Sequence, residues 1–192
     1  MIMDTKNIAK FVFELGQLRR VSHEGWKLLG IRHPDTVAEH SLRAAQIGYI
    51  LASLEGYAKP EEVCSMLVFH DMAEARVGDL HKVASRYASA DETRAAQEQT
   101  APLEEIGTSI FNLWNQVEEK STPAGIIAKD ADYLETALTG QEYLEQGHAY
   151  AQDWIDKVAK ALKTESAKKL LAEIQKTNSN EWWQGLKKLS PT

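Results

Sequence analysis

One stretch of the sequence places acid, base and metal-binding side chains directly after a strongly apolar segment. Residues 63–69 are apolar on nearly every side, His70 and Asp71 follow at once, and Glu74 lies one turn further on. Residues three or four positions apart share a helix face, so we expect these side chains to converge. Buried ionisable groups are costly unless they are hydrogen-bonded, paired or bound to a metal. The pattern indicates a metal site, although a lone His-Asp pair also occurs in ordinary helix packing.

Two further segments are predicted to supply ligands. His40 falls in the first turn of a predicted helix, where the positive end of the helix dipole favours the neutral imidazole that binds metals. Asp130 and Asp132 both fall in an otherwise apolar helix. Because they lie about 200° apart around its axis, one is expected to face the interior and the other to face outward. Two imidazoles and two carboxylates suit a divalent Co, Mn, Fe, Ni or Zn ion.

Capping signals predict where the helices that hold these groups begin. Thr36 and Glu39 match a capping box and open the helix of His40. Ser89 and Glu92 match a second capping box, before a polar helix near residues 90–100. Each box satisfies two backbone N–H groups that a helix leaves without partners at its start.

The remaining periodicity predicts an all-α fold. A helix is expected to open at Pro60, the favoured position for proline, and to run on through His70, Asp71 and Glu74. Strand signals are essentially absent. Apolar residues at helical spacing predict further helices near residues 5–20, 36–54, 150–161 and 164–176.

Length and composition restrict the class of protein. The 192 residues suit a single domain, expected to span 1–192 with a core at about 5–146 and C-terminal helices at about 150–189 packed on it. A net charge of -6 argues against a general binder of nucleic acids or anionic membranes. The single cysteine, Cys64, rules out a disulfide framework within the chain and fits the reducing cytoplasm.

The order His, His-Asp, Asp on helices resembles the HD-domain phosphohydrolases, and most closely their 5'-deoxynucleotidase branch. The likeness runs from about residue 5 to residue 185 and preserves order and approximate spacing. The motifs that carry it are residues 25–26, 36–41, 70–80, 113–114, 122–124, 129–135 and 141–143.

The resemblance implies a metal-dependent hydrolase. It selects Asp132 over Asp130, and members usually act as homodimers that hydrolyse deoxynucleoside monophosphates to nucleoside and phosphate. The metal would activate a water molecule and orient a phosphate oxygen. The implied ligands of one divalent ion (Co, Mn, Zn, Fe or Ni) are His40, His70, Asp71 and Asp132.

The same resemblance implies catalytic and substrate-binding roles. Glu74 would position or protonate reacting groups, and Asp79 would support the site or the sugar. The loop with Trp26 would line the nucleoside pocket, although a Trp in a loop is often only a packing plug. The predicted catalytic residues are therefore Glu74 and Asp79, and the predicted substrate-binding residues are Trp26, His23 and Asp79.

Two positions depart from the family pattern. Relatives commonly carry an Arg for phosphate just before the Trp, where this sequence has His23. Relatives also often have Thr-Pro where residues 81–82 are His-Lys. Both changes bear on substrate recognition and leave the expected metal ligands intact. Candidate replacements for the phosphate-binding Arg are Arg20, Arg32 and Arg76.

Other interpretations of the same core are open. HD-type enzymes also cleave deoxynucleoside triphosphates, cyclic nucleotides or ppGpp, and a non-catalytic nucleotide-binding protein would keep the fold. In each case the expected partner is a small nucleotide, and neither a nucleic-acid polymer nor a membrane. The Trp182-Trp183 pair is expected to pack in the core or in a dimer interface.

Overall fold

The computed structural model describes residues 4–186 and forms an all-α fold. The predicted domain, 1–192, also includes residues 1–3 and 187–192, which lie outside the described residues. The only β-type pairing found between residues 4 and 186 is an isolated bridge from Ser22 to Thr36. The all-α prediction is therefore confirmed. Within the same range, no helix has both the length and the apolar character needed to cross a bilayer.

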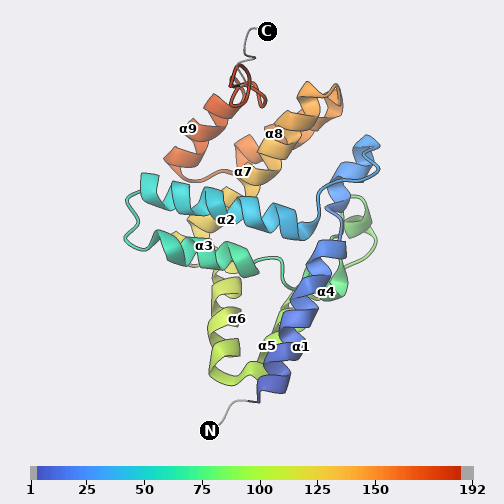
Figure 1. Cartoon of the computed structure of the whole chain (residues 1–192), viewed down its shortest axis with the longest axis vertical. Helices are drawn as coiled ribbons and strands as arrows, with labels where there is room; N and C mark the ends of the chain where they lie inside the picture. Colours follow the sequence, from blue (N-terminus) through green and yellow to red (C-terminus); the bar gives the residue numbers. More distant parts are fainter. Residues whose placement is uncertain (1–3, 187–192) are drawn as a thin grey trace, which may run out of the picture.

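Helices α2 and α3 lie side by side across the middle of the molecule (Figure 1). Helices α8 and α9 lie on one side of α2, and α1, α5 and α6 extend on the opposite side. The bounds are α1 (Thr5–Leu15), α2 (Val37–Leu54), α3 (Pro60–Phe69), α4 (Glu74–Val77), α5 (Glu92–Thr100), α6 (Glu104–Glu119), α7 (Pro123–Glu145), α8 (Gln152–Ala161) and α9 (Glu165–Ile174).

The main core joins α2, α3 and α7. Leu51, Leu67 and Leu134 contribute one wholly buried side chain from each of these helices. Gly48 allows α3 to approach α2 closely, because a Cβ atom there would lie 2.2 Å from Leu67 Cδ1. The three helices that flank the predicted metal ligands are thus fixed by one tightly packed core.

A second apolar cluster holds the segment that follows the His-Asp pair. Met72 and Ala73 are buried against Phe11 of α1 and Trp114 of α6. This cluster gives the segment after α3 a fixed position even though it is not part of a long helix.

The two predicted capping boxes have different outcomes. At α2, Thr36 Oγ1 accepts from the Glu39 N–H at 3.3 Å and Glu39 Oε2 accepts from the Thr36 N–H at 2.7 Å, so this box is confirmed. The box at Ser89 is wrong. Helix α5 is capped by Asp91, whose Oδ1 accepts from the Arg94 N–H at 3.0 Å. Asp91 stands directly before the helix and accepts as well as Ser does.

The helix predicted to carry His70, Asp71 and Glu74 together ends earlier than expected, at Phe69. The following backbone closes tighter turns, with the Met72 N–H donating to Phe69 O at 3.1 Å and the Glu74 N–H to Asp71 O at 3.0 Å. Neighbours in a straight α-helix point about 100° apart. The break in the helix lets the adjacent side chains of His70 and Asp71 turn toward one point.

The first predicted helix, 5–20, is also shorter than expected. Helix α1 ends at Leu15, and Gly16–Arg20 forms a 3₁₀ helix. The predicted helices at 150–161 and 164–176 correspond to α8 and α9. Both of these pack against α7.

Candidate metal centre

Four potential ligand atoms face one point between α2, the turn after α3, and α7. His40 Nε2 lies 3.2 Å from Asp132 Oδ1 and 3.6 Å from Asp71 Oδ2. His70 Nε2 lies 3.1 Å from Asp71 Oδ2 and 3.8 Å from Asp132 Oδ1. Atoms that each lie about 2.1 Å from a shared cation are separated by roughly 3 Å or a little more. His40, His70 and Asp132 form a cluster that could hold a metal ion, and Asp71, the fourth predicted ligand, lies next to both imidazoles.

The hydrogen bonds of the two imidazoles fit this use. His70 is 2% exposed, its Nδ1 donates to Leu67 O at 2.8 Å, and its Nε2 is buried without a hydrogen-bond partner. His40 is 3% exposed and its Nδ1 bonds to Glu135. With each Nδ1 donating, each Nε2 presents a lone pair toward carboxylate oxygens. Lone pairs and carboxylates repel each other unless a cation lies between them, so the donor set fits a divalent metal.

The carboxylates that would share a metal ion with the imidazoles otherwise favour a proton on them. Burial alone would lower the pKa of His40, but hydrogen bonds to Asp132 and Glu135 raise it well above its ordinary value. Burial alone would raise the pKa of Asp132, but Lys129 and the two imidazoles hold it well below its ordinary value. A divalent cation bound between the carboxylates would take the place of that proton.

Lys129 fixes the orientation of the Asp132 carboxylate. Its Nζ lies 2.9 Å from Asp132 Oδ2 and 3.8 Å from Glu118 Oε1. Since Oδ2 is occupied by the ammonium group, Asp132 offers Oδ1 alone to the imidazoles. The Asp132 charge in turn raises the pKa of Lys129.

Glu74, predicted to be catalytic, opens α4 beside the centre. Burial, followed by the charges of Asp71 and Asp79, raises its pKa to about 10. Burial, together with the charges of Glu118 and Asp71, also raises the pKa of Glu92. Glu74 and Glu92 therefore both lie within reach of the charge of Asp71.

Asp130 does not face outward as one of the two aspartates was expected to do. It is 1% exposed, and its carboxylate accepts from the Lys163 N–H at 3.0 Å and from the N–H and hydroxyl of Thr164 at 2.6 and 2.7 Å. The expectation is wrong because the link between α8 and α9 covers the side of α7 opposite Asp132. Asp130 anchors this link, whereas Asp132 faces the centre.

The loop that carries His23 and Trp26 packs beside the centre. The His23 ring lies 4.7 Å from the His40 ring, and Asp79 Oδ2 accepts from the Glu24 N–H at 2.6 Å. Trp26 has no exposed surface and packs 5.3 Å from Trp154. The Trp26 side chain thus acts as a packing plug that fixes the loop, and substrate contact by His23, Trp26 or Asp79 stays a prediction.

The three candidate arginines lie away from the centre or are already paired. Arg76 bonds to Glu14 of α1 and to Glu98 of α5. Arg20 bonds to Gln17 Oε1 at 3.2 Å, and Arg32 is exposed. None of the three contacts a predicted ligand through the hydrogen bonds or ion pairs found in residues 4–186.

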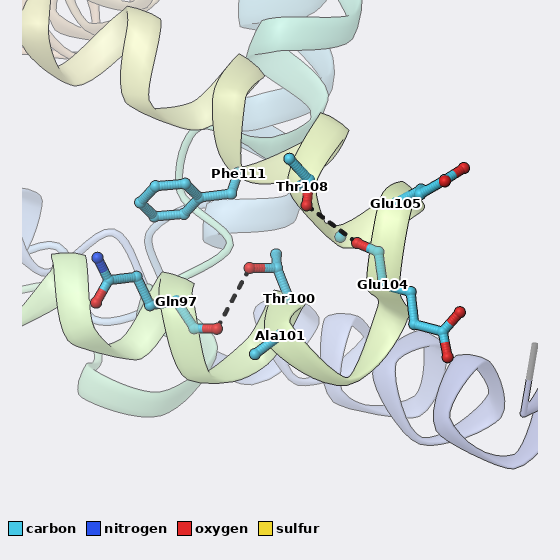
Figure 2. A pocket seen from close by; sticks show the side chains of 8 residues that line it. Gln97, Thr100, Ala101, Glu104, Glu105, Thr108 and Phe111 are labelled. Carbon is cyan, nitrogen blue, oxygen red and sulfur yellow. Dashed lines mark hydrogen bonds between the residues drawn. The ribbon is translucent and has the colours of Figure 1, made fainter.

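Other clusters and cavities fit a metal or a nucleotide less well. His23, His40 and Glu135 also lie within ligand distance of one another, but Glu135 already carries the Arg43 guanidinium at 2.7 Å. A cavity of about 550 Å³ lies at the turn between α5 and α6, away from the centre. Figure 2 shows Thr100, Phe111 and the carboxylates of Glu104 and Glu105 among the residues that line it, and none of its lining residues is a histidine or a predicted metal ligand.

The sequence analysis missed two residues behind the centre, Glu135 and Arg43. Glu135 is 1% exposed, and hydrogen bonds from His40 and Arg43 overcome the effect of burial and lower its pKa to about 2. The signal was present in the spacing. Arg43 follows His40 by one turn, and Glu135 follows Asp132 by one turn, so each pair shares a helix face.

Comparison with known proteins yields named relatives. The 5'-deoxynucleotidase HDDC2 of Dictyostelium discoideum is 30% identical over 152 residues, which cover 74% of this chain and 80% of the relative. The protein of the same name from Homo sapiens is 25% identical over 180 residues, covering 91% of this chain and 87% of the relative.

Solved structures and a family match agree with this result. A crystal structure of a genomics target is 36% identical, with a TM-score of 0.79, and covers 93% of this chain and 99% of its own. A predicted coding region from Archaeoglobus fulgidus is 29% identical, with a TM-score of 0.65 and the same coverage. The family model described as "HD domain" matches residues 15–175. This chain therefore belongs to the HD domain family.

Proposed function

We propose that this protein is a metal-dependent 5'-deoxynucleotidase, which hydrolyses deoxynucleoside 5'-monophosphates to deoxynucleoside and phosphate. The observation that carries the proposal is the convergence of two imidazole Nε2 atoms and two carboxylate oxygens from three segments of the chain. The chain is an HD domain protein, and its curated relatives are named 5'-deoxynucleotidases.

The ligands would be His40, His70, Asp71 and Asp132, holding one divalent ion. A mixed nitrogen and oxygen set without thiolates suits Co, Mn, Fe, Ni or Zn. Such an ion would supply Lewis-acid activation of water and of a phosphate oxygen. Lys129 holds the second oxygen of Asp132, which leaves one oxygen for the ion and keeps coordination positions free for substrate.

Glu74 would handle protons in the reaction. In the hydrolysis, water adds to phosphorus, the bond from phosphorus to the 5'-oxygen breaks, and the leaving oxygen takes up a proton. Glu74 opens α4 beside Asp71 and Asp79. A carboxyl group there can hydrogen-bond the water or the leaving oxygen.

Asp79 and His23 would form the substrate side of the pocket. Asp79 holds the loop of residues 21–35 through the Glu24 N–H, and this loop places His23 next to His40. A sugar bound there would meet Asp79, and a phosphate at the metal would meet the His23 ring. Trp26 would set the shape of the pocket from behind rather than through its own surface.

The test is phosphate release by metal-stripped protein that is resupplied with Co, Mn, Zn or Mg. Matched deoxy- and ribonucleoside mono- and triphosphates serve as substrates. Metal-dependent release of orthophosphate from deoxynucleoside monophosphates is the expected result. Release of triphosphate from deoxynucleoside triphosphates would contradict the substrate, and tight nucleotide binding without turnover in every metal would contradict the activity.

The protein is also proposed to act as a cytoplasmic homodimer. Support for the dimer comes from Trp182, which is 77% exposed and lines an apolar groove with Leu138 and Ile174. Sedimentation analysis of Trp182→Ala should show more monomer than the parent chain. Tyr150→Ala, at an exposed aromatic residue that does not line this groove, is the matched control. Support for the compartment is the lone free cysteine.

A further inference from the structure

The two imidazoles of the centre are held from behind in different ways. His70 Nδ1 donates to a neutral backbone oxygen, Leu67 O, at 2.8 Å. His40 Nδ1 instead bonds to Oε2 of Glu135, a carboxylate that is 1% exposed. A charged acceptor makes the opposite nitrogen of the ring a stronger donor to a metal, and it fixes the tautomer more firmly than a carbonyl does.

The carboxylate of Glu135 is itself held in place by two other side chains. Its Oε1 accepts from Arg43 Nε at 2.8 Å and from the Thr139 hydroxyl at 3.0 Å, while Arg43 also bonds to Thr139. All polar atoms of Glu135 therefore have partners, and the planar guanidinium limits the rotation of the carboxylate. Glu135 is thus held in one orientation by Arg43 and Thr139.

Arg43 is further tied to the surface by Glu142. Its Nη1 donates to Glu142 Oε1 at 2.7 Å, and the Glu142 side chain is 39% exposed. Glu142 touches the same arginine as Glu135 but is not in contact with His40. Glu142→Gln therefore makes the same chemical change as Glu135→Gln at a residue that does not face His40.

We propose that Glu135, held by Arg43 and Thr139, is a positioning residue that sets the tautomer and orientation of His40 for metal binding. This inference rests on the metal site of the proposed function. Substitution of such outer groups typically weakens metal affinity or activity 10- to 100-fold.

The test uses Zn²⁺ as the probe and requires no substrate. The dissociation constant is measured by competition with a chelator for the parent chain, Glu135→Gln, Arg43→Lys and Glu142→Gln. Glu135→Gln should bind Zn²⁺ about 10- to 100-fold more weakly. The dissociation constant of Arg43→Lys should lie between those of Glu135→Gln and the parent chain. Lysine keeps the positive charge but lacks the paired, planar N–H donors of the guanidinium. Glu142→Gln should stay within about twofold of the parent.

A spectroscopic measurement separates positioning from general stability. In ¹⁵N-histidine NMR of the Zn²⁺-loaded chain, His40 should appear with its proton on Nδ1, and this signal should shift or broaden in Glu135→Gln while that of His70 does not. Unchanged Zn²⁺ affinity together with an unchanged His40 signal would overturn the proposal, whatever happens to Tm. A parent chain that does not bind Zn²⁺, Mn²⁺ or Co²⁺ would instead overturn the metal site itself.

Discussion

At the residue scale, α7 assigns two nearby aspartates to different tasks. Asp132 faces the two imidazoles and Lys129, whereas Asp130 faces the opposite side and receives hydrogen bonds from the link to α9. Their separation around the helix is what allows one to face the imidazoles and the other to face the link. The two residues are therefore a matched pair for separating metal binding from stability.

Asp132→Ala should abolish metal binding and activity, while Asp130→Ala should mainly reduce stability. Removing the Asp130 carboxylate leaves the N–H groups of Lys163 and Thr164 without their acceptor, which costs about 3 kcal/mol for bonds to a charged group. Urea unfolding and metal titration on both variants check this. Equal losses of metal affinity in the two variants would contradict the separation.

Glu74→Gln should lower kcat by at least about 100-fold and leave metal affinity nearly unchanged. The amide keeps the shape of the side chain, but it cannot accept or give up the proton of the reaction, a role worth roughly 10²–10⁴ in rate. The measurement is steady-state phosphate release alongside metal titration. Normal turnover by this variant would remove Glu74 from the mechanism.

At the element scale, the segment of residues 78–91 is attached to α8 by Lys82. Its Nζ lies 2.7 Å from Asp153 Oδ2 and 3.9 Å from the centre of the Trp154 ring. Trp154 also packs on Trp26. Lys82 of this segment and the loop that carries His23 and Trp26 therefore both contact the same Trp154 ring.

Asp153→Asn should loosen this segment. Hydrogen exchange in residues 78–91 should be roughly two- to fivefold faster, as expected for loss of an exposed ion pair. Lys157→Gln is the control, since Lys157 bonds to Asp153 but lies on α8 itself.

The same contact has a defined pH dependence. Hydrogen bonds from Lys157 and Lys82 lower the pKa of Asp153 to about 2. A lowered pKa means that the contribution is complete above the unfolded value of about 4 and is lost as the pH falls toward 2. The parent chain and Asp153→Asn should therefore exchange at increasingly similar rates below about pH 4, and a constant difference down to pH 2 would contradict this.

The local signals predicted the starts of α2 and α3 and the ends of α2 and α8, but they missed the cap of α5 and the end of α3. Thr36 with Glu39 caps α2 and Pro60 opens α3 as expected, because these signals depend only on neighbouring residues. The end of α3 at Phe69 depends on burial of Met72 against distant helices. The burial of Asp130 depends on a link more than 30 residues away. Such tertiary contacts leave no signal in a short window of sequence.

In the candidate site, too, the sequence predicted some residues and missed others that depend on tertiary contacts. The four ligands were expected from residue type, order and family resemblance; the structure places their side chains next to one another, and their binding of a metal stays a prediction. Glu135 was not given a role, because its partners His40 and Arg43 come from a helix about 90 residues earlier in the chain. The contacts of Glu135 with His40 and Arg43 exist only because α2 packs on α7, so the sequence alone does not predict them.

At the scale of the whole molecule, a bound metal would join three segments of one core. Its proposed ligands lie on α2, in the turn after α3, and on α7. A ligand that binds only the folded state adds about 2.7 kcal/mol at 100 times its dissociation constant. In a chain of this size that corresponds to roughly 5–10 °C in Tm.

Removal of the metal with a chelator should therefore lower Tm by about that amount, and resupply should restore it. Differential scanning calorimetry of the parent chain and Asp132→Ala checks the expectation. The variant should show no shift with either treatment. A similar shift in the variant would place the stabilising ion elsewhere.

The position of His40 between two carboxylates of α7 makes the site sensitive to sliding of α2 along α7. Asp132 and Glu135, one turn apart on α7, lie against the two nitrogen atoms of one ring that belongs to α2. A slip of α2 along α7 by a single residue, about 1.5 Å, would separate the ring from both carboxylates at once. Such a slip leaves helix content unchanged. Under pressure or mild heating, loss of catalysis would therefore report sliding of these helices before circular dichroism detects any unfolding.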